Sequence, residues 1–478
     1  MQARSQSSLQ ISLVGSWPAL DRAEPINVDR RRTMTNKRMI LSAFFFNPQG
    51  DHRMSWRHPA APKSEIFTLD YFRRLASAAE LAKLDAIFLA DHVAIWDSYE
   101  SNVAHYANVR LEPLTLLSAL AAVTHDIGLI STASASYTEP YNLARTFASL
   151  DHISNGRSAW NVVTSGMNEE AMNFGRDGNI EHAFRYERAA EFLETAKALW
   201  DSIEDEALLF DKESGFFADP KRVHRIDQSG KHFRVRGPLN VPRPIQGHPV
   251  IVQAGSSGDG KTLAAKHAEI NFSLARSIEE GKQNRADFDE RLAQHGRKPE
   301  SLKILPGILP IVAASRSEAE EKRDLLESLT PARVAIDLVS SWVGMDLSAF
   351  PADGPVPNLP DEATFNGQRT NLVRVRNMAE QGMTIRQIAS QVAKAGTAPM
   401  MAGTPQQIAD EMEAWFTEGA ADGFNLMFPV LPEDWMDFTS SVVPELQRRG
   451  LVQREYAPGT LRDKLGLERP ANIFASAR

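Results

Sequence analysis

The segment 255–262 is the stretch of the chain best suited to binding an anion. It reads Gly-Ser-Ser-Gly-Asp-Gly-Lys-Thr and follows the apolar run 249–254. These letters satisfy the P-loop pattern, in which backbone N–H groups at the start of a helix cradle a phosphate. No clear downstream strand ends in a metal-binding Asp. We therefore expect a phosphate site at Ser256 and Ser257, with a P-loop NTPase or a plain glycine-rich turn as the alternatives.

A second group of polar residues begins the predicted helix 182–200. His182 and Tyr186 are four residues apart, so they share one face of that helix. At a helix N-terminus an imidazole and a phenol can close the other side of a phosphate pocket. The alternative is an ordinary solvated helix start.

Two further candidates follow the first two predicted strands. Asp91 and His92 come directly after the apolar run 86–90, where a carboxylate can bind a hydroxyl or a ring N–H, or merely cap the next element. The loop 51–59 carries two histidines and two arginines, which suit acid–base chemistry and an anionic substrate. A surface loop with chance polar residues is the alternative. There is no HExxH motif and the histidines are scattered, so we predict no metal site.

The elements that must position these residues alternate between apolar runs and helical patterns. Strands are predicted over 39–46, 86–90, 127–134, 158–163, 249–254, 270–274, 302–312 and 423–428. This βαβ rhythm with eight strands predicts a (β/α)₈ TIM barrel with insertions, rather than an open Rossmann sheet. The candidate residues follow the carboxyl ends of different strands, so we expect them to meet in one mouth of the barrel.

Several segments interrupt or flank the predicted barrel, which spans residues 34–467. Residues 1–33 are rich in Ser and Arg and are expected to be a disordered leader. We predict insertions at about 204–247, with a hairpin, and at about 345–400, with a helix-turn-helix-like stretch. Residues 468–478 are expected to be a C-terminal tail.

Composition excludes several classes of protein. The 478 residues include 53 Lys and Arg against 61 Asp and Glu, a net charge of −8, which offers no broad cationic surface to nucleic acid. The chain has no Cys, so disulfides, Cys-ligated metals and thiol nucleophiles are excluded. No run approaches the ~18 apolar residues of a membrane-spanning helix, and there is no secretory segment. We therefore expect a cytoplasmic protein with no membrane partner.

Ordered blocks throughout the chain resemble one enzyme family. They include WRHP (56–59), DAIFLAD (85–91), TASASYTEPYNLAR (132–145), NFGRDGNIEHAFRYERAAEF (173–192), HFRVRGPLNVPRPIQGHPVIVQAGSS (232–257) and TLRDKLGL (460–467). The chain resembles the bacterial luciferase-like, flavin-dependent monooxygenases, in the branch of nitrilotriacetate monooxygenase component A, dibenzothiophene sulfone monooxygenase and pristinamycin synthase component A. The resemblance runs from about Met39 to Leu467 and is strongest with the aminopolycarboxylate oxygenases.

The resemblance implies a barrel that binds FMN, delivered as FMNH₂ by a separate NAD(P)H-dependent flavin reductase. It implies that O₂ reacts with the reduced flavin to give a C4a-peroxyflavin that oxygenates the substrate. The FMN-binding positions it implies are Asp91, Thr132, His182, Tyr186, Ser256 and Ser257. It also suggests Asn161 near the isoalloxazine edge, Phe45 against the ring, and His52 as a hydrogen-bond donor or acid. Arg53, Arg57 and His58 are the candidates for holding a substrate carboxylate.

The expected function is therefore that of an FMNH₂-dependent, two-component monooxygenase. It would oxygenate an aminopolycarboxylate such as nitrilotriacetate, or a related amine or organosulfur compound, leading to C–N or C–S cleavage. We expect a homodimer or homotetramer. A flavin-binding barrel without oxygenase activity and the P-loop NTPase are the alternatives.

Overall fold

The computed structural model describes residues 37–365, 369–395 and 398–475. One compact unit comprises Arg38–Arg478 and carries every element named below. The leader expected over residues 1–33 lies outside the described residues.

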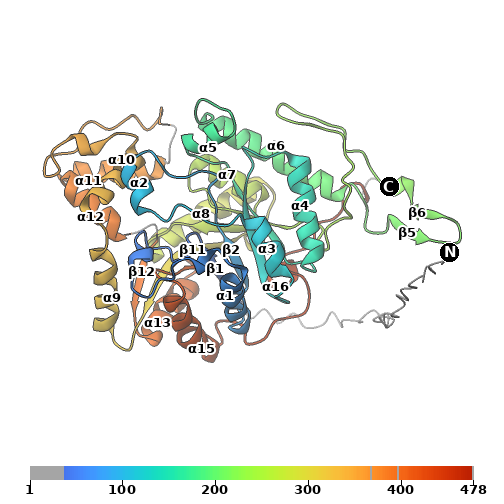
Figure 1. Cartoon of the computed structure of the whole chain (residues 1–478). Coiled ribbons are helices and arrows are strands. Elements are labelled where there is room, and N and C mark those ends of the chain that lie inside the picture. Colours follow the sequence, from blue (N-terminus) through green and yellow to red (C-terminus); the bar gives the residue numbers. More distant parts are fainter. Residues whose placement is uncertain (1–36, 366–368, 396–397, 476–478) are drawn as a thin grey trace, which may run out of the picture. The chain divides into compact units, whose positions relative to one another are not determined.

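In the described part of the chain, eight parallel strands form a closed barrel (Figure 1). The strands are β1 (Ile40–Phe45), β2 (Ala86–Leu89), β3 (Gly128–Ser134), β4 (Ser158–Val163), β9 (Val250–Gln253), β10 (Ile270–Ser273), β11 (Lys303–Val312) and β13 (Gly423–Met427). The barrel closes through β13, which pairs with β11 on one side and with β1 on the other. The predicted TIM barrel and its eight strands are confirmed.

Side-chain alternation along the strands separates two hydrophobic cores. In β1, Ile40 and Phe44 belong to the core inside the barrel, whereas Leu41, Ala43 and Phe45 belong to the core between the barrel and its helices. Successive side chains of a strand point to opposite faces, so the parity of a position decides which core it enters. This rule also decides which side chains at the strand ends face the mouth.

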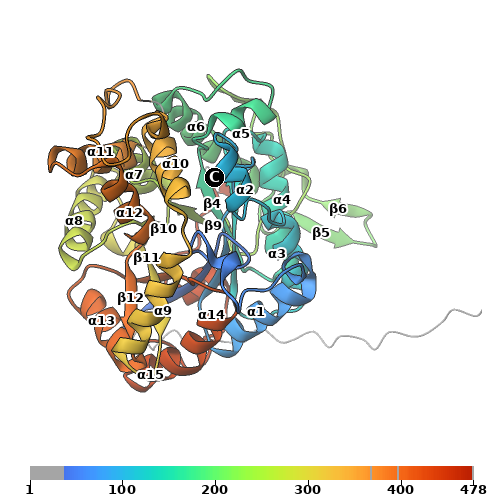
Figure 2. The same cartoon turned by 60° about the vertical axis from the view of Figure 1, so that its left-hand side comes forward.

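Helices surround the barrel in the order expected of repeated βα units (Figure 2). The larger ones are α1 (Leu69–Leu81), α3 (Pro113–Ala121), α4 (Pro140–Ile153), α6 (His182–Asp201), α7 (Gly258–His267), α8 (Ile278–Gln294), α9 (Arg316–Ser328) and α13 (Pro405–Thr417). The short helices α14 (Glu433–Asp437) and α15 (Val443–Arg448) follow β13. The sequence analysis did not find α8, because Phe288 and Leu292 are the only large apolar side chains that this helix buries among its described residues.

The segment 204–247 forms two small antiparallel ribbons outside the barrel. One pairs β5 (Leu208–Asp211) with β6 (Phe216–Ala218), and the other pairs β7 (Gln228–Ser229) with β8 (Arg234–Val235). The second ribbon lies where the sequence predicts a hairpin. The first projects from the body of the barrel in Figure 1.

Three helices form a layer of their own beside the barrel mouth. They are α10 (Ala332–Val343), α11 (Arg369–Glu380) and α12 (Ile385–Ala395). Leu338 and Trp342 of α10 share one hydrophobic core with Leu372 of α11 and Ile388 of α12. We therefore propose that this insertion begins near Ala332, ahead of the expected Met345. After it, β12 (Met400–Gly403) pairs with the last four residues of β11.

The C-terminal segment closes the amino-terminal end of the barrel. Helix α16 (Leu461–Lys464) places Leu461, together with Leu465 and Leu467, in the core inside the barrel. Arg462 is almost fully buried and binds Glu269 and the carbonyl of His248. This end is opposite the mouth, so the C-terminal segment does not cover the polar residues at the carboxyl ends of the strands.

The mouth is also ringed by short elements between the strands. These are α2 (Glu100–His105), α5 (Asn168–Asn173) and the single turns Ser55–Arg57, Glu65–Phe67 and Leu347–Ala349. None of the described helices is both long enough and apolar enough to cross a membrane.

Candidate functional site

Two neighbouring strands deliver a polar pair into the barrel. Thr132 of β3 and Asn161 of β4 are partners in register, and Asn161 Nδ2 donates a hydrogen bond of 2.9 Å to Thr132 Oγ1. Both side chains are buried, and Asn161 Oδ1 has no hydrogen-bond partner among the described residues. An unpaired buried acceptor costs free energy unless a ligand or water satisfies it. This pair therefore fits one edge of a ligand in the mouth.

Asp91 and His92 follow β2 at the same end of the barrel. Burial raises the pKa of Asp91 to about 6, although the positive charge of Arg110 opposes this shift. His92 lies with its ring edge against Phe46, with ring centroids 5.2 Å apart, and its Nδ1 is 3.7 Å from Glu170. Asp91 is thus a partly buried carboxylate at the mouth, within the field of Arg110.

The aromatic side chain that faces the mouth at the end of β1 is that of the next residue, Phe46, which packs against the core inside the barrel. Phe45 instead points outward, and its ring lies 5.8 Å from that of Trp435. The expectation for Phe45 is corrected by strand alternation, since a residue one position along faces the opposite side. The guanidinium carbon of Arg110 lies 3.9 Å from the centroid of the Phe46 ring.

Arg110 and Asp51 are site residues that the sequence analysis missed. Arg110 Nε and Nη1 are buried and have no hydrogen-bond partner among the described residues, and the same holds for Asp51 Oδ2. Burial raises the pKa of Asp51 to about 7, against hydrogen bonds from the N–H groups of Phe46 and Asn47. Asp51 opens the loop 51–59, which drew attention for its histidines, whereas no pattern in the sequence singled out Arg110.

The segment predicted to bind an anion forms the start of α7. Ser257 caps the helix, and its Oγ accepts a hydrogen bond of 3.2 Å from the Gly260 N–H. A Cβ placed on Gly258 would meet no heavy atom within 4 Å, so there is open space beside the first residue of the helix. Ser256 Oγ lies 3.2 Å from Thr370 Oγ1 of α11. Backbone N–H groups and two serine hydroxyls are thus available to an anion.

His182 and Tyr186 lie on α6 beside this site. His182 Nδ1 is 3.0 Å from Asp259 Oδ2 on α7, and the two rings of His182 and Tyr186 are 4.9 Å apart. Burial lowers the pKa of His182, as do Arg185 and Arg369, while Asp259 opposes the shift. The two helix starts therefore meet, as the sequence predicts.

The geometry of Lys261 argues against the P-loop alternative. In a P-loop the lysine reaches the β- and γ-phosphates. Here Lys261 Nζ binds Asp287 Oδ2 of α8 at 2.8 Å and lies 5.8 Å from the ring centroid of Phe288. The lysine is thus directed to the neighbouring helix and away from the helix start.

His52, in the loop after β1, is a neutral hydrogen-bond donor in this structure. His52 is buried, and its Nδ1 accepts a hydrogen bond of 3.3 Å from the Met54 N–H. Burial, Arg53 and His58 together lower the pKa of His52 to about 4. The imidazole is therefore neutral at pH 7, with its proton on Nε2, which has no partner among the described residues. His52 can donate a hydrogen bond but is a poor acid at neutral pH.

Of the three candidates for binding a carboxylate, the structure places one beside the mouth. Arg53 Nη1 donates to Tyr106 Oη at 3.3 Å, and its guanidinium carbon lies 5.7 Å from the ring centroid of Trp342. Arg57 is exposed and donates to the carbonyl of Leu329 at the end of α9. His58 is half-buried, and its Nδ1 accepts from the Ala60 N–H. Arg57 thus contacts the end of α9, whereas Arg53 contacts Tyr106 and Trp342.

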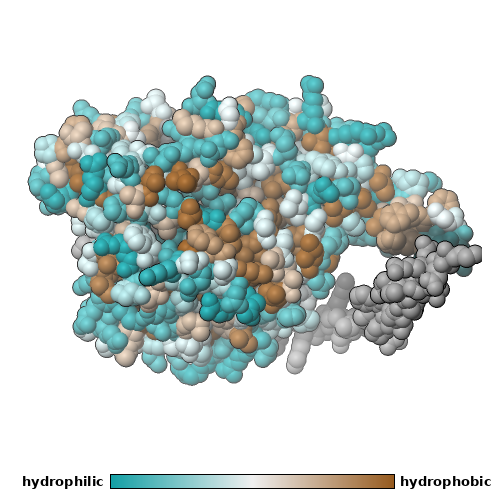
Figure 3. Space-filling model, viewed as in Figure 1, coloured by the Kyte–Doolittle hydropathy of each residue, from teal (hydrophilic) through white to brown (hydrophobic). Residues whose placement is uncertain are grey.

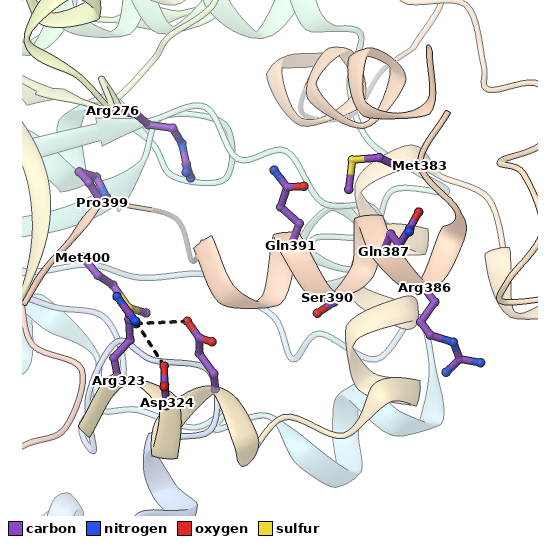
Figure 4. Close-up of a pocket in the computed structure, with 11 residues that line it drawn as sticks. Arg276, Arg323, Asp324, Met383, Arg386, Gln387, Ser390, Gln391, Pro399 and Met400 are labelled. Carbon is purple, nitrogen blue, oxygen red and sulfur yellow. Dashed lines mark hydrogen bonds and ion pairs between the residues drawn. The ribbon is translucent and has the colours of Figure 1, made fainter. Parts of the chain in front are cut away.

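Two hollows adjoin the mouth. A cavity of about 420 Å³ is lined by residues that include His92, Trp96, Met167 and Trp342. An open cleft of about 920 Å³ lies between α9, α12 and β12 (Figure 4). Among the described residues, no group of three or more His, Asp or Glu side chains is arranged to hold a metal ion.

Comparison with known proteins relates this barrel to one family. Residues 49–422 match the model of luciferase-like monooxygenases. The chain is 46% identical over 443 residues to N-acetyl-S-(2-succino)cysteine monooxygenase of Bacillus subtilis (strain 168), covering 92% of this chain and 99% of that protein. It is also 46% identical over 450 residues to nitrilotriacetate monooxygenase component A of Aminobacter aminovorans, with the same coverage.

A solved structure agrees with this assignment. Riboflavin lyase, crystallised with modified FMN and its substrate riboflavin, matches with a TM-score of 0.83 and 30% identity, over 92% of this chain and 100% of that one. The P-loop NTPase alternative is thereby overturned, and the chain belongs to the luciferase-like monooxygenases.

Proposed function

We propose that this protein is an FMNH₂-dependent, two-component monooxygenase acting on a small organic substrate. The substrate class we propose is an aminopolycarboxylate such as nitrilotriacetate, or a related amine or organosulfur compound, which is cleaved at a C–N or C–S bond. The observation that carries the proposal is the candidate anion site at the start of α7, beside His182, at the same end of the barrel as the amide oxygen of Asn161, which has no partner among the described residues.

The described residues fit an FMN cofactor. A phosphate would bind the N–H groups of the first turn of α7, with Ser256, Ser257, His182 and Tyr186 around it. Thr132, Asn161 and Asp91 would bind polar groups farther along the cofactor. Reduced FMN, once bound, supplies the electrons that activate O₂. The related riboflavin lyase, whose structure holds modified FMN, supports this choice of cofactor.

The chain's own residues have three tasks in this reaction. The buried Nε2–H of His52 can donate a hydrogen bond to an oxygen atom in the mouth. Arg110 places a buried positive charge over Phe46, suited to stabilising negative charge that develops nearby. The aromatic side chains Phe46, Trp96 and Trp342 keep water away from the reacting groups.

A separate NAD(P)H-dependent flavin reductase is the partner we propose. The relative from Aminobacter aminovorans is named as component A, which implies a second component in that system. Because NAD(P)H is a cytoplasmic reductant, this partnership also supports a cytoplasmic location.

We further propose that the protein is a homodimer or a homotetramer. Leu209, Phe210, Phe216 and Phe217 are all strongly exposed on the β5–β6 ribbon, which forms an apolar projection at the right of Figure 3. A two-stranded ribbon has no core of its own and such patches mark contacts between proteins. A second copy of the chain is the occupant we propose.

The proposed activity is tested by mixing the protein and photoreduced FMN with oxygenated buffer and nitrilotriacetate. We expect glyoxylate and the secondary amine in equal amounts: substrate, O₂ and FMNH₂ give amine, glyoxylate, FMN and water. N-acetyl-S-(2-succino)cysteine and a dialkyl thioether are assayed in parallel. FMN binding without product from any of the three would contradict the proposal and favour the non-catalytic flavin-binding barrel.

His52 is expected to control how much reduced flavin is used productively. His52→Ala removes a buried N–H donor, so we expect a several-fold fall in product per FMNH₂ oxidised and a matching rise in hydrogen peroxide. FMN affinity should stay within about two-fold, because no contact of His52 reaches the α7 site. Product and peroxide are measured in the same single-turnover samples.

Two variants control this experiment. His52→Gln keeps a hydrogen-bond donor at the end of the side chain. It should recover part of the coupling, which is the amount of product formed per FMNH₂ oxidised. His125→Ala removes a strongly exposed histidine and should leave it unchanged. Unaltered coupling in His52→Ala would refute the role of His52.

A further inference from the structure

Three arginines from distant parts of the chain gather where the helical insertion meets the barrel. Arg53 lies in the loop after β1, Arg276 follows β10, and Arg374 belongs to α11. The guanidinium carbons of Arg53 and Arg374 each lie 5.7 Å from the ring centroid of Trp342. The indole of α10 therefore makes cation–π contacts with both guanidinium groups.

The charges of this cluster act on one another. Burial, then Arg276 and Arg53, lower the pKa of Arg374 to about 10. Like charges at short range repel, and Glu280 attracts only Arg276 of the three. An anion that joined Arg53 and Arg374 would relieve the repulsion between these two.

Carboxylates of the chain do not neutralise the Trp342 pair. Among the described residues, neither Arg53 nor Arg374 has a salt-bridge partner, and Arg53 Nε is buried without a hydrogen-bond partner. Nearby arginines of the same insertion behave differently: Arg386 binds Asp353 at 2.7 Å, and Arg376 lies 3.8 Å from Glu362. The chain thus leaves the two guanidinium groups on Trp342 available to an external carboxylate.

The cluster adjoins both hollows beside the mouth. Arg276 lines the open cleft and points toward the face of α12 that carries Gln391 (Figure 4). Trp342 lines the cavity that also contains His92, and Arg53 directly follows His52. A ligand bound to the arginines would thus lie next to the proposed site of oxygen transfer and within reach of solvent.

We propose that Arg53 and Arg374 bind the carboxylates of a substrate that carries at least two of them, and so select polycarboxylates over neutral amines, thioethers and sulfones. This inference rests on the proposed function and narrows its substrate class. Guanidinium groups pair with carboxylates through two parallel hydrogen bonds, which fixes orientation as well as charge. The barrel would thus bind the flavin, and the helical insertion would recognise the charge of the substrate.

The test is equilibrium binding to the full-length protein without flavin, measured by calorimetry. The probes are nitrilotriacetate, N-acetyl-S-(2-succino)cysteine, tricarballylate and the trimethyl ester of nitrilotriacetate. We expect at least one acid to bind and the ester not to bind. Arg374→Gln and Arg53→Gln should each weaken binding of that acid by about 10- to 100-fold, since each removes a charged hydrogen-bonding partner.

Matched variants separate recognition from folding. Arg386→Gln removes an arginine of the same insertion that is exposed and paired with Asp353, and it should change the affinity by less than about two-fold. Arg374→Lys keeps the charge without the forked geometry and should recover part of the binding. Thermal unfolding of each variant shows that the fold is retained.

The outcomes distinguish this inference from the function on which it rests. Unchanged affinity in both glutamine variants, or binding of the ester as tight as that of the acid, would overturn the arginine site. So would a wild-type protein that binds none of the three acids yet oxygenates a neutral substrate with FMNH₂ and O₂. If an acid binds through the arginines but no product forms with any substrate, the proposed function is wrong and the arginine site is supported.

Discussion

Gly258→Asp is expected to weaken FMN binding by about 100-fold, which corresponds to about 2.7 kcal/mol. The new carboxylate would stand at the first residue of α7, where the proposed phosphate meets the helix start. Two negative groups then compete for the same N–H donors and the same positive end of the helix.

The substitution is expected to leave the fold intact. A Cβ at Gly258 has open space, and the residue does not lie in the left-handed region. An acidic residue in the first turn of a helix is favourable by itself. Affinity is measured by quenching of FMN fluorescence, and thermal unfolding is followed by circular dichroism.

Gly258→Ala is the matched control for the change in backbone and volume. It adds the same Cβ without charge and should bind FMN within about three-fold of the wild type. If the aspartate variant binds FMN as tightly as the alanine variant, the phosphate does not bind at the start of α7.

Asp51→Asn is expected to stabilise the protein at pH 8 by about 2–4 kcal/mol. Burial raises the pKa of Asp51 from 3.8 to about 7, so the folded state prefers the protonated acid. The stability that this acid contributes is fully present below pH 3.8 and is lost as the pH rises through 7. At pH 8 the folded protein holds a buried charge that the amide avoids.

The advantage of Asp51→Asn should shrink steadily between pH 8 and pH 4. The free energy of unfolding is measured by urea titration at several pH values for both proteins. Asp434, whose pKa burial also raises to about 7, contributes in both and cancels in the difference.

Asp70→Asn is the control for the sign of the change in the free energy of unfolding. Asp70 is exposed, and hydrogen bonding with Arg73 lowers its pKa, so this substitution should give no stabilisation at pH 8. A variant Asp51→Asn that is less stable than the wild type at pH 8 would show that the carboxylate is charged and satisfied in the folded protein.

Local patterns in the sequence were sufficient to predict the barrel and to place the candidate anion site at the start of a helix. Period-two apolar runs and helical spacing are short-range signals, and the eight strands lie where they place them. The Gly-Ser-Ser-Gly segment and the start of α6 are also local, because a helix N-terminus is defined by its own first turn. His182 and Asp259 meet because both helices start at the same end of the barrel.

Tertiary structure alone decided which side chains share the mouth. Phe45 and Phe46 are adjacent in sequence, and the closed barrel determines which of them faces inward. Lys261 matched a phosphate-binding pattern, yet Asp287 of a helix that the sequence analysis missed binds its ammonium group. Arg110 has no local signal, since its surroundings come from the loops after two different strands.

The sequence by itself therefore determined the architecture and the family, and it located the helix start at which we propose that an anion binds. The arginine pair could come only from the folded chain, because Arg53 and Arg374 are more than 300 residues apart in the sequence and meet on the ring of Trp342. Hydrophobic periodicity and helix caps depend on neighbours in sequence, whereas charge recognition depends on distances through space. Such distances are settled by how the helical insertion packs on the barrel.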